Sequence, residues 1–60
     1  MIDIEKANDL TKWIQQWKKT YEENPSLEEC FTWFEWRFKT KELSTIDKNY
    51  IRNILNYNSE

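Results

Sequence analysis

The chain has 60 residues, of which 38% are hydrophobic and 17% aromatic, so it can form one small domain with a thin core. It contains no Gly, no His and one Cys, which excludes a glycine-rich phosphate loop, a zinc cage and a disulfide scaffold. The net charge of −2 gives no strongly basic surface for nucleic acid.

The first segment predicts a helix over about residues 4–23. Asp3 is a suitable N-cap, and Pro25 ends the segment because proline cannot continue a helix. Apolar residues follow one another at spacings of three and four, which places them on one helical face: Ala7, Leu10, Ile14, Trp17 and Tyr21.

The second segment predicts a helix over about residues 27–42. Ser26 and Glu29 have the spacing of a capping box, in which each side chain bonds the other residue's backbone N–H. The apolar face comprises Leu27, Phe31, Phe34 and Phe38, with Cys30 beside it. Phe34 is central to this face, so we expect it in the core. Lys39 and Lys41 suit the C-terminal end, where the helix dipole favours cations.

The third segment predicts a helix over about residues 45–57, because Ser44 precedes Asp47 by three residues and offers a second N-cap. Its apolar stripe is broad. We expect its centre at Ile46, Tyr50, Ile54 and Tyr57, with Ile51 and Leu55 at its edge. Three such helices with short connections predict an all-α fold, a compact three-helix bundle forming a single domain over residues 1–60.

Two tryptophans depart from the helical pattern of the second segment. At about 100° per residue, Trp36 points almost opposite the apolar face, and Trp33 lies between the two. In one interpretation this helix is sandwiched between the others and both rings are in the core. In the other they form a protein-binding patch, because Trp is enriched among residues that dominate interface energetics. Its members would be Glu29, Thr32, Trp33, Trp36 and Thr40.

The third helix presents a polar side that allows an alternative interpretation. Arg and Asn can read guanine and adenine edges, so this side is conceivable as a recognition helix of a helix-turn-helix-like DNA-binding regulator. Its members are Lys48, Asn49, Arg52, Asn53 and Asn56. A solvated helix face is the simpler interpretation, because it carries only two cations and phosphate contacts supply most nucleic-acid affinity.

The remaining candidates for chemistry are weak. Cys30 has no His to activate it, and its apolar setting should raise its pKa. The glutamates around Pro25 lack the alternating oxygen ligands and the Gly of a calcium loop. We therefore expect no enzyme, no catalytic residue, no metal and no cofactor. The acidic N-terminus and the lack of a long apolar run predict a cytoplasmic protein that does not act at a membrane.

These observations favour a small, non-enzymatic intracellular module that binds another protein. An inhibitor or regulator of a larger protein, of the kind that phages and mobile elements encode, fits the size and the compositional bias. The alternatives are the DNA-binding regulator and a self-associating helical protein, a homo-oligomer in which the Trp patch completes a core too small to stand alone.

Overall fold

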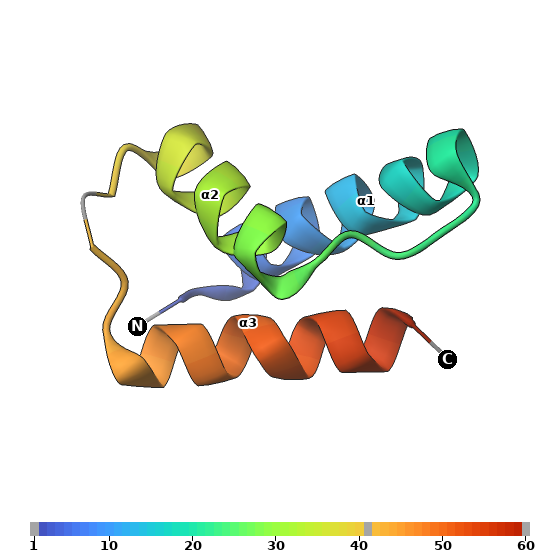
Figure 1. The fold of residues 1–60 in the computed structure, drawn as a ribbon. Helices are drawn as coiled ribbons and strands as arrows, with labels where there is room; N and C mark the ends of the chain where they lie inside the picture. The colour runs from blue at the N-terminus through green and yellow to red at the C-terminus, as the bar shows by residue number, and fades with distance from the viewer. Residues whose placement is uncertain (1, 41, 60) are drawn as a thin grey trace.

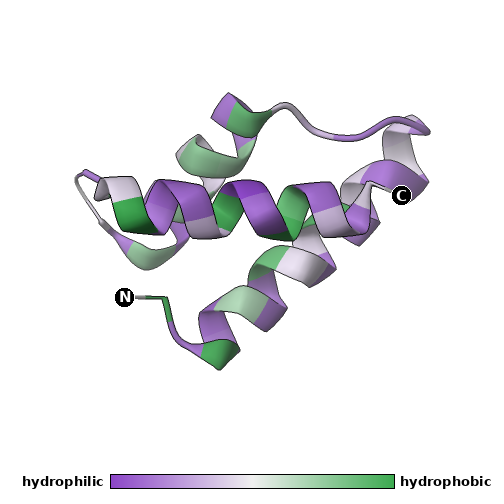
Figure 2. Cartoon of the chain, turned by 90° about the horizontal axis from the view of Figure 1, so that it is seen from below, coloured by the Kyte–Doolittle hydropathy of each residue, from purple (hydrophilic) through white to green (hydrophobic). Residues whose placement is uncertain are grey.

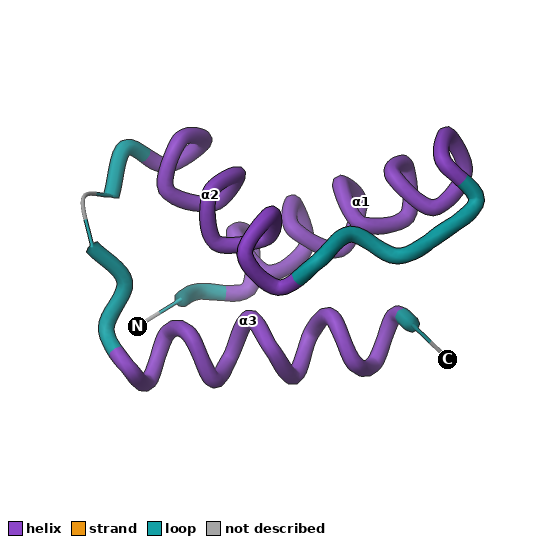
Figure 3. Tube along the Cα trace, in the orientation of Figure 1, coloured by secondary structure: helices purple, strands orange, loops and turns teal. Residues whose placement is uncertain are grey.

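The computed structural model describes residues 2–40 and 42–59, and within them it is a three-helix bundle without strands (Figure 1). The predicted all-α fold is therefore confirmed. The helices are α1 (Ile4–Tyr21), α2 (Leu27–Phe38) and α3 (Thr45–Asn58). α3 runs along the bottom of the view, α2 lies above it, and loops join the helices (Figures 1 and 3). Seen from below, α3 lies in front and α1 crosses obliquely behind it (Figure 2).

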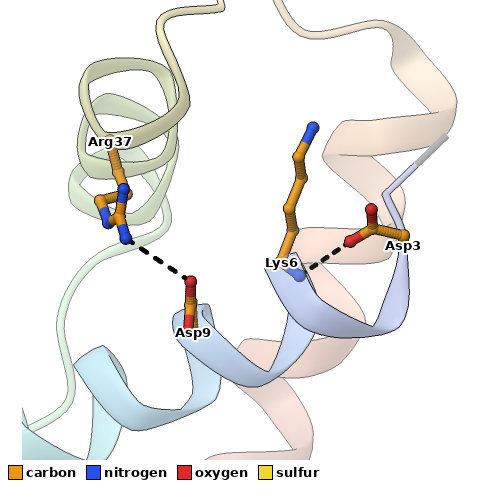
Figure 4. Close-up of polar contacts among 4 residues, drawn as sticks. All are labelled: Asp3, Lys6, Asp9 and Arg37. Carbon is orange, nitrogen blue, oxygen red and sulfur yellow. Dashed lines mark hydrogen bonds and ion pairs between the residues drawn. The ribbon is translucent and has the colours of Figure 1, made fainter.

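Each helix begins at the predicted N-cap. Asp3 Oδ1 accepts a hydrogen bond of 2.9 Å from the Lys6 backbone N–H (Figure 4). Ser26 Oγ accepts from the Glu29 N–H at 3.1 Å, and Glu29 Oε1 accepts from the Ser26 N–H at 3.2 Å, which completes the capping box. The N-cap of α3 is Ser44, whose Oγ accepts from the backbone N–H of Asp47 at 3.2 Å.

The first two helices end earlier than predicted. α1 stops at Tyr21 rather than near residue 23, because Glu22 adopts the left-handed conformation with φ of 57°. α2 stops at Phe38 rather than near residue 42, because Lys39 does the same with φ of 55°. Both residues occupy the position usually taken by Gly, which this chain lacks. Lys41 lies outside the described residues.

The core is small and draws on all three helices. Its buried members among the described hydrophobic residues are Ile2, Leu10, Ile14, Cys30, Phe34, Leu43 and Ile51. Phe34 is 3% exposed, which confirms the predicted centre of the α2 face. Ile2 and Leu43 precede α1 and α3 and extend the core beyond the helices, a contribution that helical periodicity does not reveal.

The predicted apolar face of α3 was wrong in its orientation. Ile51, expected at the edge, is fully buried, whereas Ile46 and Tyr57, expected at the centre, are 69% and 80% exposed. Tyr50 is also exposed, at 39%, and Ile54 is half-buried. The helix is rotated so that its aliphatic edge, rather than its tyrosines, faces the other helices. Apolar residues cover a wide arc of α3, and only the side that fits between α1 and α2 can be buried.

Aromatic rings form a second layer that joins α1 to α2. Trp13 and Trp33 stack with ring centroids 5.1 Å apart and an interplanar angle of 15°. Trp17 continues this layer along α1. The centroid of its ring lies 5.4 Å from that of Trp13 and 4.5 Å from that of Tyr21. At the far end of the bundle, Lys18 Nζ donates to the backbone carbonyl of Asn58 and so ties α1 to the last turn of α3.

We expect Ser26→Ala to lower the free energy of unfolding by about 1 kcal/mol, because it removes the acceptor of the Glu29 N–H and leaves the core unchanged. Urea unfolding followed by circular dichroism measures this loss. Thr32→Ala, which removes an exposed hydroxyl from the middle of the same helix, is the control and should be no less stable than the wild type. A Ser26→Ala protein as stable as the control would contradict the role of Ser26 as a cap.

We expect Phe34→Ala to cost about 3–5 kcal/mol, the usual range for truncating a buried Phe, and so to remove much of the stability of so small a domain. The ring packs 4.7 Å from that of Phe38, between centroids, inside the bundle. The thermal unfolding midpoint measures the effect. An unchanged midpoint would show that the face of α2 is assigned wrongly.

Candidate interaction surfaces

Trp36 is a surface residue. Its side chain is 74% exposed, and it lies on the side of α2 opposite the buried Phe34. Glu29 and Thr32, which precede it on this side of the helix, are exposed as well. Of the two interpretations open from the sequence, the structure therefore matches the surface interpretation for Trp36. α2 packs on α1 and α3 with one side only, so nothing in the described chain covers this ring.

Trp33 is partly withdrawn from this surface. Its ring is half-buried, stacked on Trp13 of α1 and in edge contact with Phe38 at 6.0 Å between centroids. The structure matches the core interpretation for this residue. Thr40 also does not share the helical face of Trp36, because α2 has already ended and the Thr40 N–H donates to the Glu35 carbonyl at 3.0 Å. The surface is therefore centred on Trp36, with Glu29 and Thr32, and is defined here as the Trp36 surface.

Arg37, which follows Trp36 in α2, contacts residues on the side away from the Trp36 surface. The Arg37 Nη2 lies 3.8 Å from the Asp9 Oδ2 of α1 (Figure 4). The guanidinium carbon of Arg37 is also 5.2 Å from the centroid of the Phe38 ring. Both partners of the ion pair are substantially exposed, so its contribution to stability is small. These contacts nevertheless direct Arg37 toward α1 and away from Trp36.

The residues proposed for nucleic-acid recognition are all exposed on α3, where they lie along one side of the helix. Lys48 Nζ lies 5.7 Å from the centroid of the Phe31 ring, so this cation is directed toward α2. Arg52 follows Lys48 by one turn on the same side of α3. The asparagines lie farther round the helix, beside the exposed tyrosines, at positions 49, 53 and 56. Arg52 lies one turn before Asn56 and so connects the two cations to the asparagines. The resulting polar side carries only two cations, and one of them is directed over the Phe31 ring.

An open hollow lies between α1 and α3. Its volume is about 230 Å³, and its lining is formed by Thr11, Tyr50, Asn53, Ile54, Tyr57 and Asn58. The sequence did not indicate this feature, because the tyrosines were expected in the core. Ligand pockets usually measure roughly 300–1,000 Å³. The hollow is smaller than this, so its size suits a single side chain better than a cofactor.

Cys30 is buried among the apolar side chains of the core. Burial, together with the negative charge of Glu29, raises the pKa of its thiol from 9.0 to about 11. The thiol is therefore neutral near pH 7, whereas a nucleophilic cysteine must be a thiolate. Cys30 acts in this fold as a small hydrophobic residue.

Comparisons with protein-family models, with curated proteins and with solved structures gave no match to this chain. Within residues 2–40 and 42–59, no helix is both long and apolar enough to cross a lipid bilayer. The same residues contain no group of three or more Cys, Asp or Glu side chains placed to hold a metal ion.

We expect Cys30 to resist alkylation by iodoacetamide in the folded protein and to react fully in urea, because the folded thiol is both inaccessible and protonated. The reaction can be followed by mass spectrometry at pH 8. The folded chain holds the thiol proton of Cys30 more tightly than the unfolded chain does. The stability that this thiol contributes is therefore complete below pH 9 and is lost as the pH rises through about 11. Rapid alkylation without denaturant would contradict the burial.

Proposed function

We propose that this chain is a protein-binding module and that Trp36 is the anchor of its binding surface. The observation that supports this proposal is the 74% exposure of Trp36 on an ordered helix, on the side facing away from the core. In this proposal the chain acts in the cytoplasm by binding rather than by catalysis. It inhibits or regulates a larger protein, as small proteins of phages and mobile elements do.

The energetics of the Trp36 surface support a binding role. An exposed Trp contributes little to folding, but it offers a large contact area at a small cost in side-chain entropy. The backbone that carries this ring is held in place, because α2 is capped by Ser26 and packed through Phe34. A partner therefore meets an ordered surface and does not have to fold it, which reduces the free-energy cost of binding.

The DNA-binding alternative has less support. Lys48 and Arg52 are the two cations of α3, and one of them is directed over the Phe31 ring. Nucleic-acid affinity depends mainly on several phosphate contacts, and the chain carries a net charge of −2. The contact with Phe31 accounts for Lys48, and a solvated helix side accounts for Arg52.

The test of the proposed function is Trp36→Ala. We expect this variant to keep the helical signal and nearly the melting temperature of the wild type, because the ring is exposed in the free protein. Its affinity for a partner isolated from the source cell should fall about thirtyfold or more, which corresponds to about 2 kcal/mol for a central aromatic anchor. Affinity capture identifies the partner, and titration calorimetry measures the loss.

Ile4→Ala is the matched control for this experiment. Ile4 is also 74% exposed, but it begins α1 and does not belong to the Trp36 surface. Its truncation should leave both the fold and the partner affinity unchanged. A Trp36→Ala protein that is unfolded, or that binds as tightly as the Ile4→Ala control, would refute the role of Trp36 as an anchor.

A further inference from the structure

One exposed arc of α3 carries no charge, although 33% of the residues in the chain are charged, and Arg52 borders this arc one turn before Asn56. At about 100° per residue, six residues of this helix fall within about one third of its circumference. All six are exposed, and they are Ile46, Asn49, Tyr50, Asn53, Asn56 and Tyr57. We refer to them as the α3 face. Depletion of charge and enrichment in Tyr are features of protein interfaces, and Tyr with Asn is also typical of the binding loops of antibodies.

The α3 face contains both a protrusion and a hollow. Ile46, near the start of the helix, is 69% exposed and forms an apolar protrusion. About two turns farther along lies the hollow of about 230 Å³, whose lining includes Tyr50, Asn53 and Tyr57 of the same face. Ile54 and Thr11 close its inner side between α1 and α3. An apolar side chain and a space suited to one are thus present on one helix.

We propose that the α3 face binds a second copy of this chain, with the two α3 helices antiparallel about a two-fold axis. A two-fold axis brings the same surface of both copies together, so that each protrusion meets the other copy's hollow. When Ile46 of one copy lies opposite residues 53 and 54 of the other, the axis passes close to Tyr50. The dimer then has two identical Ile46 contacts at its ends and a pair of Tyr50 rings at its centre.

The charge distribution favours a second copy as the occupant. Two identical surfaces always bring like charges together, and the six residues of the α3 face carry none. Of the two cations of α3, Lys48 is directed toward the Phe31 ring of α2. Arg52 lies at the edge of the face, next to Asn49 and Asn56, and is exposed, so solvent screens its charge at the rim of the contact. The asparagine amides of the face can both donate and accept hydrogen bonds, which suits contacts between identical chains.

The area indicates how strong this dimer can be. Ile46, Tyr50 and Tyr57 together offer roughly 400 Å² per copy, taking about 200 Å² for a fully exposed large side chain. Two copies then bury roughly 800 Å² through these residues, and the asparagines add to this, whereas standard interfaces bury roughly 1,200–2,000 Å². The dimer is therefore weak and reversible, and its population depends on protein concentration.

This proposal is independent of the Trp36 surface. α2 and α3 lie on opposite sides of the molecule in the view of Figure 1, and the α3 face points away from the core. A dimer through α3 leaves Trp36 of both copies exposed and makes the module bivalent. Loss of one interaction therefore leaves the other intact, and the two proposals can fail separately.

Sedimentation equilibrium over a range from micromolar to millimolar protein tests the dimer. We expect the mean mass to rise from the 7.5 kDa of the monomer toward twice this value. Ile46→Glu should keep the chain monomeric over the whole range, because the carboxylate would have to enter an apolar hollow. The variant should still fold, since an acidic residue in the first turn of a helix is favourable.

Ile4→Glu is the matched control. Ile4 and Ile46 both lie in the first turn of their helices and are 74% and 69% exposed, so the two substitutions change charge and apolar area alike. The control should dimerise as the wild type does. A wild type that stays monomeric at millimolar concentration, a mass that grows past the dimer, or equal loss of association in both variants would overturn the proposal.

A charge-swap pair tests the position of the two-fold axis. Tyr50→Lys and Tyr50→Glu should each be monomeric alone, because like charges would meet at the axis, whereas an equimolar mixture should form a heterodimer. Circular dichroism checks that each variant is folded, and Trp36→Ala should dimerise normally. Folded charge-swap variants that dimerise alone as well as when mixed would overturn the proposed register.

Discussion

The burial of Ile51 between α1 and α2 is the contact on which the bundle depends. Only a few large side chains are fully buried in the described chain, and Ile51 shares this core with Leu10 and Ile14 of α1 and Cys30 of α2. Helices of 12 to 18 residues are marginal in water on their own, so their tertiary packing holds them. Because Ile51 faces inward, the tyrosines of α3 must face outward. The α3 face is thus a consequence of how the core is packed.

The elements that could be predicted from the sequence are those set by local interactions. The caps at Asp3, Ser26 and Ser44 bond a backbone N–H three residues ahead, so the residues involved are close in sequence and visible as a pattern. For Trp36 the sequence left a core and a surface interpretation open, and the structure matches the second. The helical angle places Trp36 opposite the apolar face of the second helix, but only the packing of α1 and α3 on one side of α2 decides that this ring is exposed.

The orientation of α3 could not be predicted in this way, because its apolar residues surround much of the helix. Helical spacing gives two equally regular stripes and does not choose between them. One consists of Ile46, Tyr50 and Tyr57, and the other of Ile51, Ile54 and Leu55. The choice is made by residues from other parts of the chain. The core also includes Ile2 and Leu43, which lie outside the helices, and the hollow beside Thr11 exists only after α1 crosses α3. The early ends of α1 and α2 are likewise left-handed turns without the Gly that usually marks them.

The separation of the core from the exposed aromatic residues bears on how this small chain can work. A domain of this size has only a few kcal/mol of stability, and its buried residues cannot also serve as contacts for a partner. Trp36 and Tyr57 are 74% and 80% exposed, so the fold does not require their rings, and substitution there can change binding without unfolding the bundle. Trp33 differs, because its stacking on Trp13 links α2 to α1. An interaction that needed the Trp33 ring would have to withdraw it from the bundle, whereas one through Trp36 leaves every described core contact in place.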